Sequence, residues 1–383
     1  MCGSRQLETL VHLDSGRALR SDRVVVASRL HKLRCAACGL VQDAGRDASF
    51  REDGYYRCEY EAGGAFQEHV FYTPQGPVAR SQLLAEWLGS AAAGEPWRSA
   101  RRALEVGAGA GHLLERLAAL HAQVHFEGLE PGAQAAALAR ARGLAVRRGT
   151  PADDAAEPVD LVYGVAVLEH VPSPTAFLRD LRARLRPGGW LLLCQPTQDV
   201  PSYDVLFVDH LHHFGSAHLA AYARKTGFRE LDAAVGHPWM PNFSLHAWRA
   251  EDVEGACAAW QGPPAETTCA RTVAGVMADM AALDATLRRL AAARRRVAAF
   301  GLHEVYALAR AYSGLGDFPL VCGFDDDPSR LAHAGLAFPV VPPQQGLRFG
   351  VQDAVLSMNR VYYEQAQKRL AALGIAAHPV LSS

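Results

Sequence analysis

Short apolar runs alternate with amphipathic stretches through the middle of the chain. Each run is short and nearly continuous in apolar residues, as buried strands are. The expected strands lie at 103–108, 124–130, 160–165 and 190–195. The helices expected between them lie at 111–121, 132–142 and 174–185. This alternation predicts a doubly wound parallel sheet from about Tyr72 to Arg249.

The pattern changes on both sides of this region. Residues 1–68 mix short β-like runs, at 24–28 and 39–42, with glycine and clustered cysteine, which predicts a small loop-rich module. A long Ala/Arg/Leu stretch at 264–296 predicts a connecting helix. A second α/β set follows, with strands expected at 297–301, 320–327 and 354–358 and helices near 303–312 and 361–373. We therefore expect three parts, with boundaries 1–68, 69–250 and 251–383.

Composition and charge narrow the class of protein. The chain has 383 residues, of which 49% are hydrophobic and 21% charged, which is enough apolar material for more than one core. Its formal charge of −1 favours neither nucleic acid nor anionic lipid as a partner. The absence of a long apolar run or of a signal core at the start predicts a cytoplasmic protein. Eight scattered cysteines indicate reduced thiols, and the oligomeric state is left as monomer or homodimer.

A glycine-rich loop follows the first strand of the expected sheet. Gly107, Gly109 and Gly111 are spaced as GxGxG, and glycines at such a turn let the backbone approach a ligand closely. The second strand ends in Glu130, whose carboxylate can accept two ribose hydroxyls. A dinucleotide-binding fold would space its glycines as GxGxxG, whereas here they fall as GxGxG after an acid at Glu105. The simpler alternative is a tight turn beside an exposed glutamate.

Further segments complete a recognisable series. Asp160-Leu-Val-Tyr, Leu168-Glu-His-Val and Leu185-Arg-Pro-Gly-Gly follow the loop in order. The series resembles the class I S-adenosylmethionine-dependent methyltransferases, which implies a Rossmann-like α/β domain and that cofactor. By this resemblance the cofactor-binding residues are Glu105, Gly107, Gly109, Gly111, Glu130, Ala152, Asp153 and Val165.

The N-terminal cysteines suggest a metal. Cys35-Ala-Ala-Cys38-Gly39 is a knuckle that lets two thiolates reach one ion, and Cys2-Gly3 looks like half of another. A structural zinc ion takes four ligands, and three cysteines are evident. Three explanations stay open: a first cysteine lies just before Met1, the metal is lost, or a substitute completes the site. The candidate substitutes are His12, His31 and Cys58.

The whole chain looks like the three-part sugar C-methyltransferases. That resemblance implies an N-terminal zinc module, a methyltransferase domain and a second Rossmann-like α/β domain that helps to hold a nucleotide-linked sugar. It places the base in the loop 207–215, with Asp209 as the acid and His210 as the base. It also places His170 near the acceptor, Tyr72 as a closing aromatic residue and Phe214 as the aromatic of the loop. Phe207 stands where the family has tyrosine.

The implied reaction is methylation of carbon. A carbanion forms near neutral pH only beside a carbonyl, and a 4-keto sugar supplies one. His210 is suited to remove the adjacent proton, with Asp209 fixing its position. An O-methyltransferase uses the same histidine, so O- or N-methylation of another natural-product or cell-surface precursor is the alternative. A non-catalytic protein that binds the cofactor or a sugar nucleotide is the third possibility.

The C-terminal part resembles half of a mononucleotide fold. Gly301 follows one strand and Asp325 the next, but one glycine does not make a phosphate loop, so independent NAD binding is not expected. Asn359 lies at a strand end where it can contact the nucleotide of a sugar substrate. A structural lid whose acids cap turns is an equal alternative.

Overall fold

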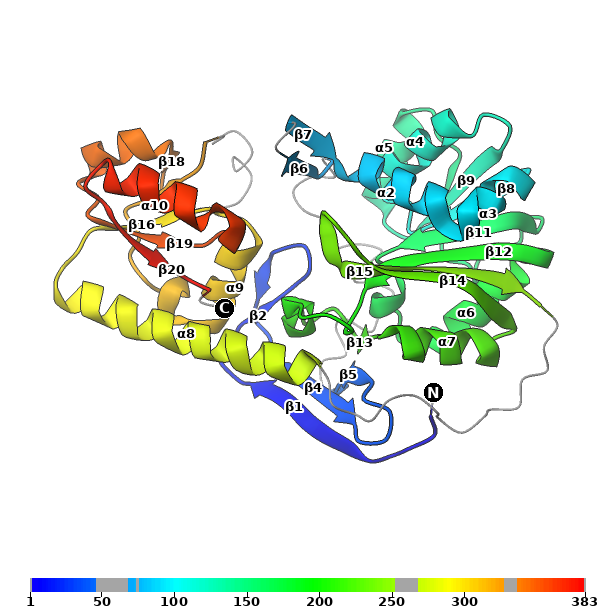
Figure 1. Cartoon of the computed structure of the whole chain (residues 1–383), viewed down its shortest axis with the longest axis horizontal. Helices are drawn as coiled ribbons and strands as arrows, with labels where there is room; N and C mark the ends of the chain where they lie inside the picture. The colour runs from blue at the N-terminus through cyan, green and yellow to red at the C-terminus, as the bar shows by residue number, and fades with distance from the viewer. Residues whose placement is uncertain (1, 46–67, 74–75, 252–267, 327–335, 382–383) are drawn as a thin grey trace. The chain divides into compact units, whose positions relative to one another are not determined.

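The computed structural model describes residues 2–45, 68–73, 76–251, 268–326 and 336–381 (Figure 1). The chain divides into two compact units. The first contains Met1–Val11, His31–Val205 and Asp209–Ala270. The second contains His12–Leu30, Leu206–Val208 and Arg271–Ser383. The expected boundaries 1–68, 69–250 and 251–383 stay a prediction.

A seven-stranded mixed sheet forms the centre of the first unit, in the order β10-β9-β8-β11-β12-β15-β14. Its strands are β8 (Arg102–Val106), β9 (His125–Glu130), β10 (Val146–Arg148), β11 (Val159–Val165), β12 (Leu185–Pro196), β14 (Phe228–His237) and β15 (Met240–Ala250). The four strands expected from the apolar runs are β8, β9, β11 and β12, and they are parallel. The expectation of a wholly parallel sheet is wrong. β15 pairs antiparallel with both β12 and β14, because a tight hairpin joins β14 to β15.

Helices cover both faces of this sheet. They are α2 (Arg80–Ser90), α3 (Glu95–Ser99), α4 (His112–Leu120), α5 (Ala133–Ala141), α6 (Pro174–Ala183) and α7 (Ser216–Lys225), with short 3-10 turns η2 (Ala91–Gly94), η3 (Leu168–His170) and η4 (Tyr203–Leu206). Successive residues of a strand point to opposite faces. Leu192 therefore packs in the core under α2 to α5, and Leu193 packs in the core under α6 and α7.

A small sheet joins the N-terminal segment to the loop after β12. Its order is β1-β4-β5-β13, and its strands are β1 (Leu7–Leu13), β4 (Leu30–Cys35), β5 (Val41–Asp43) and β13 (His212–His213). A separate hairpin pairs β6 (Val70–Thr73) with β7 (Gly76–Ala79). In the small sheet β13 pairs antiparallel with β5, so His213 lies opposite Val41. The histidine-rich loop is therefore part of the N-terminal sheet.

The second unit has a five-stranded parallel sheet in the order β18-β17-β16-β19-β20. Its elements are α8 (Thr268–Ala292), β16 (Val297–Phe300), α9 (Glu304–Tyr312), η5 (Gly314–Gly316), β17 (Cys322–Phe324), β18 (Val340–Val341), η7 (Pro343–Phe349), β19 (Asp353–Leu356), η8 (Arg360–Tyr362), α10 (Tyr363–Ala371) and β20 (Ala376–Pro379). The hairpin of β2 (Ala18–Leu19) and β3 (Val25–Val26) belongs to this unit. Leu19 N–H donates to the Tyr312 hydroxyl at 3.1 Å, and that hydroxyl donates to the Leu206 carbonyl at 2.6 Å.

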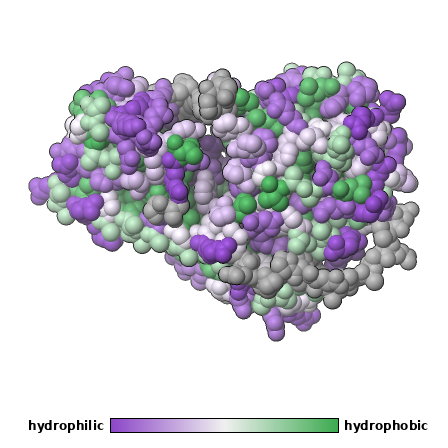
Figure 2. Space-filling model, in the orientation of Figure 1, coloured by the Kyte–Doolittle hydropathy of each residue, from purple (hydrophilic) through white to green (hydrophobic). Residues whose placement is uncertain are grey.

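Apolar and polar residues are intermixed on the face shown in Figure 2. Large exposed hydrophobic side chains such as Val361 and Leu120 stand far apart in the sequence and on different elements. Within the described residues, each helix is too short or too polar to cross a bilayer.

Candidate active site

The loop after β8 has the backbone that the glycine spacing predicts. Gly107, Gly109 and Gly111 have φ values of +74°, +54° and +82°. A Cβ at Gly107 would lie 2.7 Å from Val167, and one at Gly111 would lie 2.3 Å from Leu144. At Gly109 the same atom would meet nothing among the described residues within 4 Å. The positive φ favours glycine at all three positions, and a side chain at 107 or 111 would also force Val167 or Leu144 to shift, while Gly109 borders open space.

Glu130 ends β9 beside this loop, as expected. One carboxylate oxygen accepts from Gly109 N–H at 2.8 Å, and the other accepts from Gly132 N–H at 2.7 Å. Burial raises the pKa of Glu130, although the two backbone donors work in the opposite direction. Each oxygen keeps a second acceptor position, so the carboxylate is fixed in place and can still accept ribose hydroxyls.

The other residues expected at the cofactor differ in how deeply they are buried. Glu105 is buried and accepts from the Tyr163 hydroxyl at 3.2 Å, and burial raises its pKa well above the usual range. Val165 is half-buried at the end of β11. Ala152 and Asp153 are exposed on the turn after β10. Their roles stay predictions, and the buried hydrogen bond also gives Glu105 a structural role.

β8 and β11 are neighbours whose connections run to opposite sides of the sheet. In open α/β sheets the ligand site forms at the carboxyl ends of the strands at such a switch point. The glycine loop follows β8 at this edge, and η3, which carries His170, follows β11. The contact of Gly107 with Val167 brings the two segments together.

The loop after β12 brings two histidines to a buried carboxylate. Asp204 Oδ2 lies 3.1 Å from His213 Nδ1 and 3.5 Å from His210 Nδ1. Burial alone would raise the pKa of Asp204, but the two imidazoles lower it. Burial lowers the pKa of His213 to about 4. The described arrangement is therefore an anionic Asp204 that accepts from a neutral His213.

His170 and His210 are paired. Their rings meet edge to face with centroids 4.8 Å apart. His170 Nδ1 lies 3.0 Å from the Asp209 carbonyl, so Nδ1 carries the proton and donates it to that oxygen. The buried ammonium of Lys32 donates to the His210 carbonyl. The predicted residues His170, Asp209 and His210 are thus brought together.

Three acidic or basic side chains of this site were missed by the sequence analysis. Asp204 lies beside the His210 ring, and the role expected for Asp209 stays a prediction. Lys32 comes from the N-terminal segment, which no pattern connected to the loop. Glu169 lies within the Leu-Glu-His-Val motif, of which only the neighbouring His170 was predicted at the site. It is 2% exposed, and burial raises its pKa to about 7.

The aromatic residues expected at the site differ in position. Phe214 is fully buried and packs against Tyr222, with ring centroids 5.7 Å apart, so it is a core residue. Phe207 is buried, and its backbone bridges to Leu19 within the second unit. Tyr72 lies on β6, and its role stays a prediction.

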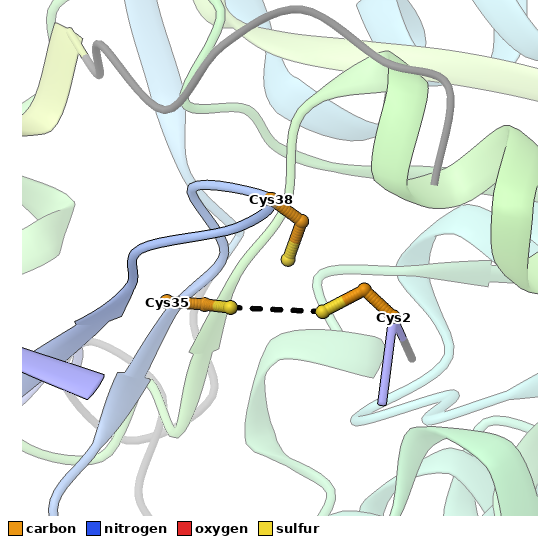
Figure 3. A group of neighbouring side chains, drawn as sticks. All are labelled: Cys2, Cys35 and Cys38. Carbon is orange, nitrogen blue, oxygen red and sulfur yellow. Dashed lines mark hydrogen bonds between the residues drawn. The ribbon is translucent and has the colours of Figure 1, made fainter. Parts of the chain in front are cut away.

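The three N-terminal cysteines converge (Figure 3). The sulfur atoms of Cys2, Cys35 and Cys38 lie within 4.8 Å of one another, with Cys2 and Cys35 3.6 Å apart. Burial opposes ionisation of Cys35, but the backbone N–H groups of Cys38 and Ala37 outweigh it and lower its pKa. Burial raises the pKa of Cys38 to about 12. Three converging thiols fit three ligands of a tetrahedral ion.

The fourth ligand stays open. Among the described residues His12 and His31 do not join the group of three thiols. Cys58 lies outside the described residues.

The polar residues at the carboxyl edge of the second sheet make local contacts. His303 Nε2 lies 3.7 Å from Asp325, and Asn359 accepts from Val361 N–H at the start of η8. The Asn359 hydrogen bond caps the start of η8, the His303–Asp325 contact joins the loops after β16 and β17, and a nucleotide contact at this edge stays a prediction.

Comparisons with known proteins match the first unit. Residues 67–233 match the family model of a methyltransferase domain. A ubiquinone biosynthesis O-methyltransferase of Paraburkholderia xenovorans (strain LB400) is 29% identical over 181 residues, which cover 40% of this chain and 76% of the relative. The enzyme of the same name from Bordetella bronchiseptica (strain ATCC BAA-588 / NCTC 13252 / RB50) is 33% identical over 116 residues, covering 27% and 46%. The chain is thus an S-adenosylmethionine-dependent methyltransferase.

A solved structure was also similar in part. It is an S-adenosylmethionine-dependent methyltransferase from Thermotoga maritima, described as a possible histamine N-methyltransferase. It is 20% identical, with a TM-score of 0.36, and the match covers 45% of this chain and 90% of that one.

The glycine loop yields a prediction. Gly111→Ala should destabilise the first unit more than Gly143→Ala, because both positions have positive φ but only residue 111 also meets a neighbouring side chain. We expect the difference in the free energy of unfolding to be about 1–3 kcal/mol, measured by urea unfolding. Equal losses in the two variants would contradict the packing argument.

Proposed function

We propose that this enzyme methylates a small-molecule acceptor whose nucleophile is freed when His210 removes a proton. The observation that supports it is the paired His170 and His210 at the edge of the sheet that carries the glycine loop. A methyl group on a sulfonium needs an electron-rich acceptor atom, and general-base action supplies one.

The residues of the loop and of β9 suit the cofactor. Gly109 leaves space beside the fixed carboxylate of Glu130, which we propose accepts the ribose hydroxyls. S-adenosylmethionine, when bound, supplies an electrophilic methyl group. Ala152 and Asp153 are proposed beside the adenine, and Glu105 and Val165 are proposed at the same edge.

The leading acceptor is a nucleotide-linked keto sugar methylated on carbon. This choice comes from the resemblance of the chain to three-part sugar C-methyltransferases. A ring nitrogen of His210 takes the proton beside the carbonyl, and the electron pair of the broken C–H bond remains on the acceptor. Asp204 lies beside the His210 ring and orients it, while the backbone carbonyl of Asp209 accepts a hydrogen bond from His170.

Methylation of oxygen is the second candidate. The relatives with the matching domain are named O-methyltransferases, and the same histidine serves a hydroxyl acceptor. The phenylalanine at 207 lacks the hydroxyl of the tyrosine that the sugar C-methyltransferases have there.

The cysteine group is proposed as a structural zinc site. The three thiols would supply three of its four ligands, and a fourth ligand from the protein would leave no open position for a substrate, so the ion would support the fold and not the reaction. The second unit is proposed to hold the nucleotide of the acceptor at the carboxyl edge of its own sheet, near Asn359.

Loss of the ribose contact should weaken cofactor binding. Glu130→Gln should raise the dissociation constant of S-adenosylmethionine about 10-fold to 100-fold, since it removes the charge from two hydrogen bonds. Isothermal titration calorimetry measures it, with the exposed Glu157→Gln as a control that should bind normally. Unchanged affinity in Glu130→Gln would place the ribose elsewhere.

The acceptor atom can be identified directly. Incubation with methyl-labelled S-adenosylmethionine and a panel of nucleotide-linked 4-keto sugars and phenols should give a labelled product, located by mass spectrometry. Label on carbon supports the first candidate, and label on oxygen supports the second.

His210→Ala should lower turnover at least about 100-fold without weakening cofactor binding. The exposed His125→Ala is the control, and near-normal turnover of His210→Ala would eliminate that base.

The zinc proposal predicts one bound ion per chain. Cys38→Ser should lose the metal, as measured by mass spectrometry of the purified protein, whereas Cys322→Ser in the second unit should retain it. A wild-type chain that holds no metal after expression with zinc would refute the site.

A further inference from the structure

We propose that Glu169 is a positioning residue for this reaction, whose buried carboxylate supplies the counter-charge for the His170–His210 pair. The inference rests on the proposed role of His210 as the base. Because Glu169 acts through the imidazoles, it need not touch the acceptor.

The geometry joins the three side chains. A carboxylate oxygen of Glu169 and one ring nitrogen each of His170 and His210 lie within 4.8 Å of one another. Glu169 is 2% exposed, and within the described part of the chain neither of its oxygens has a hydrogen-bond partner. A buried carboxylate without a partner is costly, and such groups are usually replaced or paired unless they have a role.

Two hydrogen bonds hold η3, which carries Glu169 and His170, against the histidine-rich loop. Leu211 N–H donates to the Glu169 carbonyl at 2.7 Å, and His170 Nδ1 donates to the Asp209 carbonyl at 3.0 Å. These bonds tie η3 to the histidine-rich loop at adjacent residues. Since the Nδ1 proton of His170 is used, its Nε2 carries the lone pair.

The surrounding charges make the carboxylate responsive near neutral pH. Burial raises its pKa, His170 and Arg80 favour the anion, and Asp204 opposes it. The Cys194 thiol lies within electrostatic reach and stays protonated, because burial raises its pKa to about 12. Burial also lowers the pKa of His170, and the charges of Glu169 and Asp209 act against that effect.

The carboxylate matters in the step that charges the base. When His210 takes a proton from the acceptor, a cation forms beside the second imidazole in a buried place. An ionised Glu169 offsets that cation, and the proton later leaves His210 for water. The electron pair of the bond broken by proton removal stays on the acceptor and would form the new bond to the methyl carbon, as the sulfur–methyl bond breaks and its electron pair remains on sulfur.

Two variants separate charge from shape. Glu169→Gln keeps the shape and removes the charge, and Glu169→Asp keeps the charge. We expect Glu169→Gln to lower kcat about 10-fold or more, with the KM of the acceptor and the affinity for S-adenosylmethionine within about 2-fold of wild type. The acidic limb of its pH profile should move to lower pH by about one unit, because the imidazolium is harder to form without the anion. Glu169→Asp should recover part of the loss.

A matched control tests for a general effect of losing a glutamate. Glu230 lies on β14 of the same unit and pairs with His246 at 2.8 Å, and Glu230→Gln should leave the pH profile unchanged.

A second readout does not depend on activity. In nuclear magnetic resonance titrations, the ring of His170 should titrate at lower pH in Glu169→Gln than in wild type. If the wild type methylates no acceptor, the proposed function fails, while this titration still tests the counter-charge.

Two results would overturn the proposal. One is an unchanged pH profile and unchanged His170 titration in folded Glu169→Gln. The other is activity that a chelator abolishes and a divalent ion restores only when Glu169, His170 and His210 are intact, which would make them metal ligands.

Discussion

The pairing of β13 with β5 is the constraint on which the site depends. The histidine-rich loop is a connection between β12 and α7, and a free loop of this kind would not hold two imidazoles at a buried carboxylate. The ladder pairs His213 with Val41, and Asp43 N–H donates to the Leu211 carbonyl at 2.8 Å. Lys32 adds a buried donor to the His210 carbonyl. The N-terminal segment therefore shapes the loop that carries the proposed base.

The same segment explains how the cysteines relate to the reaction. His218, on the helix after the loop, contacts the Cys38 carbonyl through Nε2 at 2.7 Å. A metal at the cysteines would stiffen the turn that this contact holds. In this arrangement the proposed structural ion would support the base without meeting the acceptor.

The parallel strands and their helices could be predicted because their signals are local. The apolar runs at 103–108 and 160–165 became β8 and β11, and the glycines at 107 and 111 have the positive φ that their spacing requires. The antiparallel hairpin of β14 and β15 was not predicted, because β14 is mostly exposed and lacks a continuous apolar run. Lys32 could not be predicted at the site, because only long-range strand pairing brings β4 to the loop with His210. Asp204 lies in the same loop as His210, but its place beside that ring depends on how the loop folds, which no local pattern in the sequence indicates.

The second unit contains two short stretches of chain that precede its main body, His12–Leu30 and Leu206–Val208. Ala18 and Leu19 are fully buried there, and Tyr312 bonds to both stretches. The second unit is therefore built from separate segments of the chain and not from one continuous C-terminal segment. Removal of the part after residue 270 would leave Ala18 and Leu19 without the core in which they are buried.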